Sequence, residues 1–384
     1  MTFCDLAECD GAEECVKPEV NLPAGVPRLR AFYLYLSSSC NLRCRHCWIT
    51  PEYENGVPLP GKVIDPKALL DAVHEGKTLG LCGAKLTGGE PMLHPQFKEI
   101  VDMLTAEGLS LNMETNGTLM TPEMARYLKD HSNIRFISVS IDSPIASEHD
   151  AFRGVKGAYD AVLRGLDALV VAGYKNCQVI MAVHKGNRHQ MKDLVALAYS
   201  HGAGSVKFNP VTRTGRGISM HERGEAFGFK EYLDLAHYVN NDLRPSSPIS
   251  VVMSMPMALT PFQELWRTKG RTHDCGVIGI LGMLGGGEIA LCGIGETVPE
   301  LVYGHLGRDS IRDIWLNHPV IQGLRRDIED SDAYPGICGS CIHAKDCRTG
   351  CVASNYGNNG RLVSPSWLCD QAYKMDLFPK TRMK

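Results

Sequence analysis

Residues 31–47 read AFYLYLSSSCNLRCRHC, an apolar run followed at once by three cysteines. The first six residues are aromatic or aliphatic, which is typical of a buried strand. Cys40, Cys44 and Cys47 then share one short loop. Three thiolates can ligate three irons of a four-iron cluster and leave the fourth iron open, as a catalytic metal site requires. A structural zinc site is the alternative interpretation, with His46 as its fourth ligand.

Outward from this segment, residues 31–209 alternate between apolar runs and amphipathic stretches. Helices are predicted to begin after Asp65 and Thr121, because each is a capping residue followed by proline. Alternation of this kind predicts an α/β fold with a parallel sheet and right-handed crossovers, either doubly wound or a barrel. In both arrangements the chemistry belongs at the C-terminal ends of the strands. The six expected strands are 31–36, 84–87, 109–114, 134–141, 177–183 and 205–209.

The composition of the 384 residues excludes several classes of protein. Lys+Arg is 40 and Asp+Glu is 43, so the formal net charge of -3 gives no electrostatic footprint for nucleic acid. No apolar run is long enough to cross a bilayer, and the acidic N-terminus lacks a signal pattern. We therefore expect a cytoplasmic protein with neither a nucleic acid nor a membrane as its partner.

The 15 cysteines are the most informative count in the composition. Reducing compartments do not maintain disulfide frameworks, so clustered cysteines in a chain without a secretion signal indicate metal. Beyond residue 273 the chain is rich in Gly and Cys, with helices expected only around 309–326, as in a small domain held by metal. Zinc is again the alternative for a Cys-x2-Cys pair. The cysteines of this second group are Cys275, Cys292, Cys338, Cys341, Cys347, Cys351 and Cys369.

Further candidate site residues follow the predicted strands. Gly88-Gly89-Glu90 comes after the second strand, where glycines permit close backbone approach and a carboxylate can pair with an ammonium group. Each such motif is weak alone, since an acidic residue after a strand is often a helix cap.

The spacing Cys-x3-Cys-x-His-Cys after strand one, followed by the Gly-Gly-Glu turn, resembles the signature of radical S-adenosylmethionine (SAM) enzymes, with His46 at their aromatic position. The resemblance implies a partial (β/α)6 TIM-like barrel and a [4Fe–4S] cluster on Cys40, Cys44 and Cys47. It also implies reductive cleavage of SAM to methionine and a 5′-deoxyadenosyl radical, which abstracts hydrogen from the substrate. The implied SAM-binding residues are His46, Gly88, Gly89, Glu90, Asn116, Ser140, Asp142 and Asn209.

The second cysteine group resembles the SPASM extension of radical SAM enzymes, which implies two auxiliary iron–sulfur clusters, expected to be [4Fe–4S]. The family pattern places the outer cluster on Cys338, Cys341, Cys347 and Cys369, and the inner cluster on Cys275, Cys292 and Cys351. The inner cluster is one cysteine short, because the stretch after Cys275 reads GVIGILG. An open iron, a cluster with fewer irons and a non-cysteine ligand such as His273 or Asp274 remain alternatives.

The resemblance covers the chain from about residue 30 and divides it into four parts. These are an N-terminal tail at 1–30, the radical SAM partial barrel at 31–240, a linker or insertion at 241–272 and the SPASM domain at 273–384. Three cysteines in the tail, Cys4, Cys9 and Cys15, are interpreted as part of a mobile segment in preference to a further metal site. Cys82 and Cys177 are expected in the core. Arg153 is expected to order the active-site loop, to contact SAM or to form a surface salt bridge.

SPASM enzymes mostly modify ribosomally made peptides, so the first hypothesis is a peptide maturase that forms a thioether or C–C cross-link in a precursor peptide. About thirty residues precede the barrel, too few for a leader-binding domain, which suggests a separate leader-peptide recognition protein. The expected reductant is a flavodoxin or ferredoxin. The second hypothesis is a haem-biosynthesis enzyme that modifies porphyrin side chains. The third is a non-catalytic binding module stabilised by zinc.

Overall fold

The computed structural model describes residues 20–54, 57–267 and 276–384. Within them, a 10-stranded sheet has the order β12-β11-β10-β1-β4-β5-β6-β7-β8-β9, and β2 (Tyr53–Glu54) and β3 (Val57–Pro58) form a separate pair. Neighbouring strands from β10 through β1 to β9 run parallel, whereas β11 and β12 are antiparallel additions. The strands of the large sheet are β1 (Ala31–Tyr35), β4 (Gly83–Thr87), β5 (Ser110–Thr115), β6 (Ile134–Ser140), β7 (Gln178–Val183), β8 (Ser205–Pro210), β9 (Ser250–Val252), β10 (Ile280–Met283), β11 (Glu288–Ala290) and β12 (Val302–His305).

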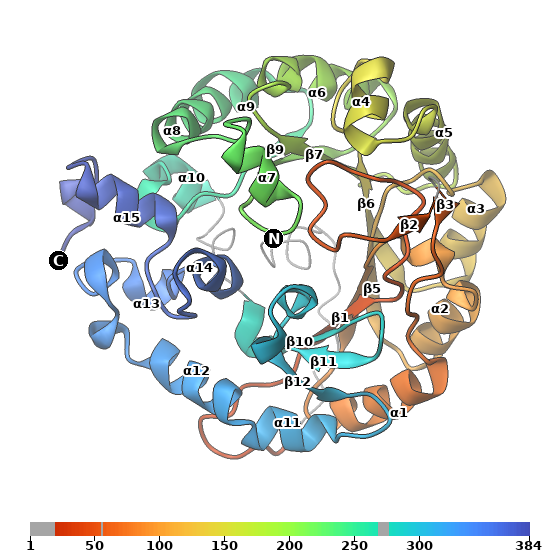
Figure 1. Cartoon of the computed structure of the whole chain (residues 1–384), viewed down its shortest axis with the longest axis horizontal. Coiled ribbons are helices and arrows are strands. Elements are labelled where there is room, and N and C mark those ends of the chain that lie inside the picture. The colour runs from red at the N-terminus through yellow and green to blue at the C-terminus, as the bar shows by residue number, and fades with distance from the viewer. Residues whose placement is uncertain (1–19, 55–56, 268–275) are drawn as a thin grey trace.

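The helices form an outer ring around the strands, as Figure 1 shows, with the C-terminal helices completing the ring on the side opposite α3 and α5. Helices outside and strands inside are the arrangement of a barrel, which decides against the doubly wound alternative. The helices are α1 (Pro66–Lys77), α2 (Phe97–Ala106), α3 (Pro122–His131), α4 (Ala146–Arg153), α5 (Ala158–Val171), α6 (Met191–Ser200), α7 (Gly217–Glu222), α8 (Phe229–Tyr238), α9 (Arg244–Ser246), α10 (Phe262–Arg267), α11 (Ile311–Asn317), α12 (Pro319–Glu329), α13 (Ala344–Cys347), α14 (Val352–Asn359) and α15 (Trp367–Lys374).

Both predicted helix caps are present. The Asp65 carboxylate accepts a hydrogen bond from the Ala68 N–H at 2.7 Å, and the Thr121 hydroxyl accepts one from the Met124 N–H at 3.2 Å. These bonds satisfy N–H groups that have no partner inside their own helix. None of the described helices has the length and apolarity needed to cross a membrane.

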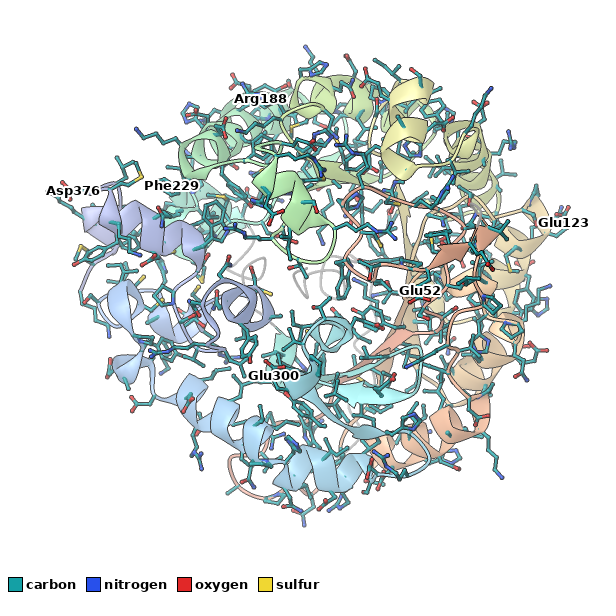
Figure 2. All side chains as sticks on the ribbon, viewed as in Figure 1. Glu52, Glu123, Arg188, Phe229, Glu300 and Asp376 are labelled. Carbon is teal, nitrogen blue, oxygen red and sulfur yellow. The ribbon has the colours of Figure 1, made fainter. Side chains whose placement is uncertain are left out.

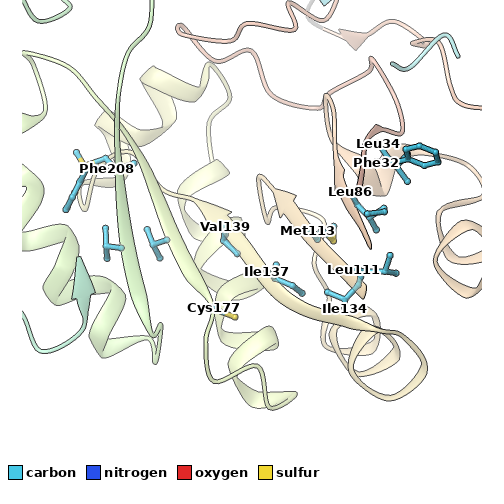
Figure 3. Packing of buried hydrophobic residues seen from close by; sticks show 14 of the residues in the cluster. Phe32, Leu34, Leu86, Leu111, Met113, Ile134, Ile137, Val139, Cys177 and Phe208 are labelled. Atoms are coloured by element: carbon cyan, nitrogen blue, oxygen red, sulfur yellow. The ribbon is translucent and has the colours of Figure 1, made fainter. Parts of the chain in front are cut away.

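The main core lies between the sheet and the helix ring. Phe32 and Leu34 of β1 are fully buried on the helix side, together with Leu86 and Leu111 of the next strands (Figure 3). The alternate residues of β1, which include Tyr33 and Tyr35, pack in a separate cluster with the ring of Trp48. Burial on both faces is typical of a parallel strand covered on both sides and explains why residues 31–36 are apolar without a gap.

The sheet extends further than the sequence predicted. Strand β9 lies inside 241–272, the segment predicted to be a linker or insertion, and it pairs with β8. Strand β10 lies in the predicted SPASM domain, yet it pairs with β1, Ala31 opposite Ile280. Both strands are three or four residues long, too short to show a period in the sequence.

The C-terminal part also contains more helix than predicted. The helices α11 and α12 match the expectation for 309–326, but α13, α14 and α15 form as well. The side chain of Asn355 in α14 donates hydrogen bonds to the carbonyl oxygens of Thr349 and Ser364, at 3.1 and 2.8 Å. Contacts of this kind hold short helices whose sequences have little apolar periodicity. Of the two cysteines expected in the core, Cys177 is buried, whereas Cys82 is half-buried.

Candidate functional site

The three cysteines of the first motif lie together in the loop that follows β1. Cys40 and Cys44 are buried and Cys47 is half-buried, and none of the three forms a disulfide. Burial raises the pKa of Cys40 to about 12, with the nearby Glu90, Cys44 and Cys47 acting in the same direction. Thiolates in such a place need a strong local positive charge, which metal ions supply. The site therefore fits a group that contains several cations.

His46, the fourth ligand in the zinc alternative, packs against an aromatic ring. It stacks on Phe152 with 4.9 Å between ring centroids, and burial lowers the pKa of His46 to about 4. Within the described ranges, no three His, Cys, Asp or Glu side chains are placed to hold one metal ion.

Three N–H groups point at the sulfur atoms of this loop. The Leu42 amide donates to Cys40 Sγ at 3.4 Å, and Asn116 Nδ2 donates to the same sulfur at 3.8 Å. Arg153 Nη1 donates to Cys44 Sγ at 3.5 Å. Hydrogen bonds to cysteine sulfur stabilise the thiolate form and tune the reduction potential of a bound cluster.

Arg153 is held in place by a buried ion pair. Its Nε lies 2.5 Å from Asp142 Oδ2, and the two side chains are 8% and 0% exposed. The other oxygen of Asp142 accepts a hydrogen bond from the Ala182 amide at 2.8 Å. Burial raises the pKa of Asp142, but Arg153 and His46 outweigh this and hold it below its usual value. Of the alternatives for Arg153, the surface salt bridge is therefore excluded, and Asp142 orients Arg153 toward Cys44.

The Gly88-Gly89-Glu90 turn packs directly against the cysteine loop. The amides of Gly89 and Glu90 donate to the carbonyl oxygens of Ser37 and Ser39, at 2.8 and 2.9 Å. A Cβ at Gly89 would lie 2.0 Å from the Ser39 oxygen, and Gly88 has a φ of +127°. These glycines therefore allow two loops of the chain itself to approach closely.

Glu90, the last residue of this turn, is fully buried. Its carboxylate accepts hydrogen bonds from the Thr115 hydroxyl and the Asn116 amide, both at 2.8 Å, and from the Met92 amide at 3.3 Å. Burial raises the pKa of Glu90 to about 7, although these bonds act in the opposite direction. A cation beside this carboxylate would favour its charged form, so the position suits an ammonium group.

The other predicted SAM-binding residues lie at strand ends. The Asn116 side chain donates to Asn41 at 2.9 Å and accepts from the Thr118 amide at 2.9 Å, so it supports the cysteine loop. Ser140 ends β6 and is half-buried, as is Asn209 next to the end of β8. The parallel strands thus bring the predicted residues to one rim of the barrel.

Sequence reasoning missed the segment after β8, which also contacts the cysteine loop. Arg216 donates to the carbonyl oxygens of Cys44 and Pro51 at 3.2 and 2.9 Å. Gly215 has a φ of +53°, and a Cβ there would lie 2.4 Å from the Cα of Trp48. The sequence offered one signal for this segment, a glycine followed by an arginine just after a predicted strand. The residues that this pair contacts belong to the cysteine loop, which lies far away in the sequence.

The four cysteines assigned to the outer cluster lie close together in the structure. Burial raises the pKa of Cys338 to about 12, and Cys347 and Cys341 add to the rise. Burial also raises the pKa of Cys369 well above its usual value, with Cys347, Cys338 and Cys341 contributing. Cys347 lies in α13 and Cys369 in α15, whereas Cys338 and Cys341 lie in the turn before α13.

Two cysteines assigned to the inner cluster share one pocket. Cys292 and Cys351 line it together with Tyr35 and Trp48, and Trp48 directly follows Cys47. The pocket therefore lies between the first cysteine loop and the inner pair. The remaining predicted or alternative ligands lie outside the described residues: Cys275, His273, Asp274, Cys4, Cys9 and Cys15.

A wide groove opens beside this pocket, between the start of α8 and the helices α14 and α15. Phe229, which Figure 2 labels, lines the groove together with Trp367 and Gln371. Cys351 and Ser354 line both the groove and the pocket. The groove therefore reaches Cys351, one of the two inner cysteines.

The chain resembles known proteins in its family, in its sequence and in its fold. A family model described as Radical SAM superfamily matches residues 34–198. The AdoMet-dependent heme synthase of Methanosarcina barkeri is 30% identical, over 89% of this chain and 96% of that protein. The mycofactocin maturase MftC of Mycobacterium ulcerans is 27% identical, over 88% of this chain and 87% of its own.

Solved structures share the fold beyond the barrel. Streptococcus suis SuiB bound to its precursor peptide SuiA has a TM-score of 0.66 and 15% identity, over 90% of this chain and 76% of SuiB. The protein anSMEcpe with bound AdoMet also has a TM-score of 0.66, with 16% identity, over 90% of this chain and 94% of its own. The predicted partial barrel with a cysteine-rich C-terminal part is thereby confirmed.

Substituting Gly89 tests the contact between the two loops. We expect Gly89→Ala to force the turn away from Ser39, to lower stability by about 1–3 kcal/mol and to reduce the iron bound after anaerobic reconstitution. Iron analysis and denaturant unfolding measure both effects. Gly357→Ala is the matched control, because a Cβ there meets no atom within 4 Å. Wild-type iron content and stability in Gly89→Ala would contradict the account.

Removing Arg153 tests the buried ion pair. Arg153→Met leaves the Asp142 carboxylate buried without its partner, so we expect a loss of about 3–5 kcal/mol in unfolding free energy. The double variant with Asp142→Asn should recover much of this loss, which a double-mutant cycle measures. Arg126→Met, which removes an exposed pair with Glu123, should have no measurable effect. An equal effect of the two arginine variants would refute a special role for Arg153.

Proposed function

This chain belongs to the radical SAM superfamily, and we propose that it modifies a ribosomally made precursor peptide by forming a thioether or C–C cross-link. The family brings a [4Fe–4S] cluster and SAM as cofactors. We propose Cys40, Cys44 and Cys47 as the cluster ligands. When bound, these cofactors supply a 5′-deoxyadenosyl radical that abstracts a hydrogen atom from the substrate. The role of the protein is to bind, to orient and to exclude water.

The residues around the cysteine loop each have a proposed task. Glu90 pairs with the ammonium group of SAM, and its bonds to Thr115 and Asn116 fix the carboxylate before SAM arrives. Arg153 and Asn116 donate hydrogen bonds to the cysteine sulfurs. Because these groups are already in place, little reorganisation accompanies binding. The remaining proposed SAM contacts are His46, Gly88, Gly89, Ser140 and Asn209, with Asp142 acting through Arg153.

The auxiliary clusters complete the proposed site. We place the outer cluster on Cys338, Cys341, Cys347 and Cys369, and the inner one on Cys275, Cys292 and Cys351. Cross-linking removes hydrogen from the substrate, so an electron must leave the site after hydrogen abstraction. The proposed auxiliary clusters would accept this electron, or the inner one would bind a substrate thiolate. The proposed reductant is a flavodoxin or ferredoxin, and a separate protein would bind the leader peptide in the cytoplasm.

The observation that carries the peptide proposal is the groove that reaches Cys351 and lies beside the pocket of Cys292. Its lining includes the side-chain amides of Asn358 and Gln371, which can pair with peptide N–H and C=O groups. The pocket beyond it is lined by Tyr33, Tyr35 and other apolar groups. An extended peptide along the groove could therefore place one apolar side chain in the pocket.

Modification of porphyrin side chains remains the second candidate function. The matches to two AdoMet-dependent heme synthases, from Methanosarcina barkeri and Nitratidesulfovibrio vulgaris, favour it. The carboxylates of a porphyrin would need cations or hydrogen bonds where they are buried. The described lining of the pocket that holds Cys292, Tyr35 and Trp48 contains neither Lys nor Arg. Arg213 and Lys374 line the groove beside it. We therefore rank the peptide first.

The cluster assignment predicts distinct effects of two cysteine substitutions. Cys369→Ala should lower the iron content by about one cluster and leave the binding of SAM intact, because Cys369 belongs to the proposed outer set. Cys177→Ala removes a buried cysteine that lies in the apolar core, and it should leave the iron content unchanged. Iron analysis of anaerobically reconstituted proteins measures both. Equal iron content in the two variants would count against the outer cluster.

The mass of the product tests the proposed reaction. Anaerobic co-expression with the shortest open reading frame beside the gene should yield a peptide that has lost a pair of hydrogen atoms for each cross-link. Tandem mass spectrometry locates the linked residues, and Cys44→Ala should leave the peptide unchanged. An unchanged peptide, together with conversion of an added porphyrin by the same enzyme, would replace this proposal with the second candidate.

A further inference from the structure

Tyr53 lies against the cysteine loop and has no task in the site described above. It is half-buried in β2, the short strand that follows the loop and pairs with β3. Its hydroxyl donates a hydrogen bond to the carbonyl oxygen of Leu42, which lies between Cys40 and Cys44 in the sequence. One tyrosine thus joins the loop to the strand pair that follows it.

Two arginines contact the ring of Tyr53. The guanidinium carbons of Arg43 and Arg216 lie 5.8 and 5.9 Å from the ring centre. Arg43 belongs to the cysteine loop, whereas Arg216 comes from the segment after β8. Because a cation near the face of an aromatic ring is attracted to it, the ring holds these two parts of the chain together.

Both arginines are also bonded to the backbone around the loop. Arg43 Nη2 donates to the Gly154 carbonyl at 3.0 Å, and the Arg43 amide donates to the Arg153 carbonyl at 2.8 Å. Arg216 donates to the carbonyl oxygen of Cys44 at 3.2 Å. The ring of Tyr53 therefore lies where the cysteine loop, the end of α4 and the segment after β8 meet.

The hydroxyl of Tyr53 also lies close to the cysteines. Burial raises the pKa of Tyr53 well above its usual value, and Cys40, Cys44 and Cys47 act in the same direction, whereas Arg216 opposes them. The phenol is therefore neutral at physiological pH. It places an aromatic group beside the three cysteines without adding a negative charge to theirs.

We propose that Tyr53 is a positioning residue, which holds the cysteine loop closed and keeps water and small solutes away from the group bound there. The inference rests on the function proposed above in one respect, the assignment of Cys40, Cys44 and Cys47 as cluster ligands. Groups that surround a metal site control the access of solvent to it. Loss of the hydroxyl removes the bond to Leu42, and loss of the ring also removes the contacts with both arginines. The loop then opens more often, as weakly held segments do.

Loss of iron from the reconstituted holoenzyme to the chelator bathophenanthroline disulfonate tests this role. Samples taken over time are reduced, and their electron paramagnetic resonance signals are recorded with and without SAM. We expect Tyr53→Leu to lose the SAM-sensitive signal roughly tenfold faster than the wild type, because it lacks one hydrogen bond and two cation–π contacts. The signals of the other clusters should decay at the wild-type rate. Tyr53→Phe keeps the ring, so its rate should lie between the two.

Tyr127→Leu and Tyr127→Phe are the matched controls. Tyr127 lies on α3, has Lys98 Nζ at 4.7 Å from its ring centre, and donates from its hydroxyl to the Lys98 carbonyl at 3.2 Å. It thus makes the same two kinds of contact outside the cysteine loop. Both control variants should lose iron at the wild-type rate.

Two results would overturn the proposal. One is an unchanged rate of loss of the SAM-sensitive signal in both Tyr53 variants. The other is an equal acceleration for all clusters, which would indicate a general loosening of the fold. Tyr53→Phe removes a single oxygen atom and keeps the test decisive if Tyr53→Leu does not fold. A wild-type protein without a SAM-sensitive signal would contradict the proposed function itself, so the two failures are distinguishable.

Discussion

The contact between the Gly88-Gly89-Glu90 turn and the backbone of residues 37–39 is the constraint on which the site depends. Two strand-to-helix connections meet there without room for a Cβ, so their relative position is fixed by backbone hydrogen bonds. Glu90 then bonds to the end of β5, and Asn116 from that end bonds to the cysteine loop. Neighbouring strands of the barrel thereby position the cysteine loop.

Electrostatics explains why the cysteine loop is suited to a metal cluster. The thiols of Cys40 and Cys44 are buried, and burial raises the pKa of both. The Asp142–Arg153 pair brings a cation to Cys44 from α4 and the end of β6, while the Asp142 charge is compensated by Arg153 and the Ala182 amide. A bound cluster would supply the positive charge that stabilises the three cysteines as thiolates.

Much of this arrangement could be predicted from the sequence, because it rests on local patterns. Apolar runs predicted the strands between residues 31 and 210. Residue type predicted the helix caps at Asp65 and Thr121, and the spacing of the cysteines predicted the two cysteine groups. Strands β9 and β10 were missed because three or four residues show no period. Contacts such as Gly89 with Ser39 and Arg216 with Cys44 join distant parts of the chain. Only the fold brings them together.

Electron paramagnetic resonance of the reduced, reconstituted protein, before and after addition of SAM, tests the central claim most directly. If Cys40, Cys44 and Cys47 hold a cluster with an open iron, SAM must change the signal of that cluster alone. Cys44→Ala must lack this SAM-sensitive signal while it retains the signals of the other clusters. A spectrum that SAM leaves unchanged, or a SAM-sensitive signal that persists in Cys44→Ala, would contradict the assignment of the site.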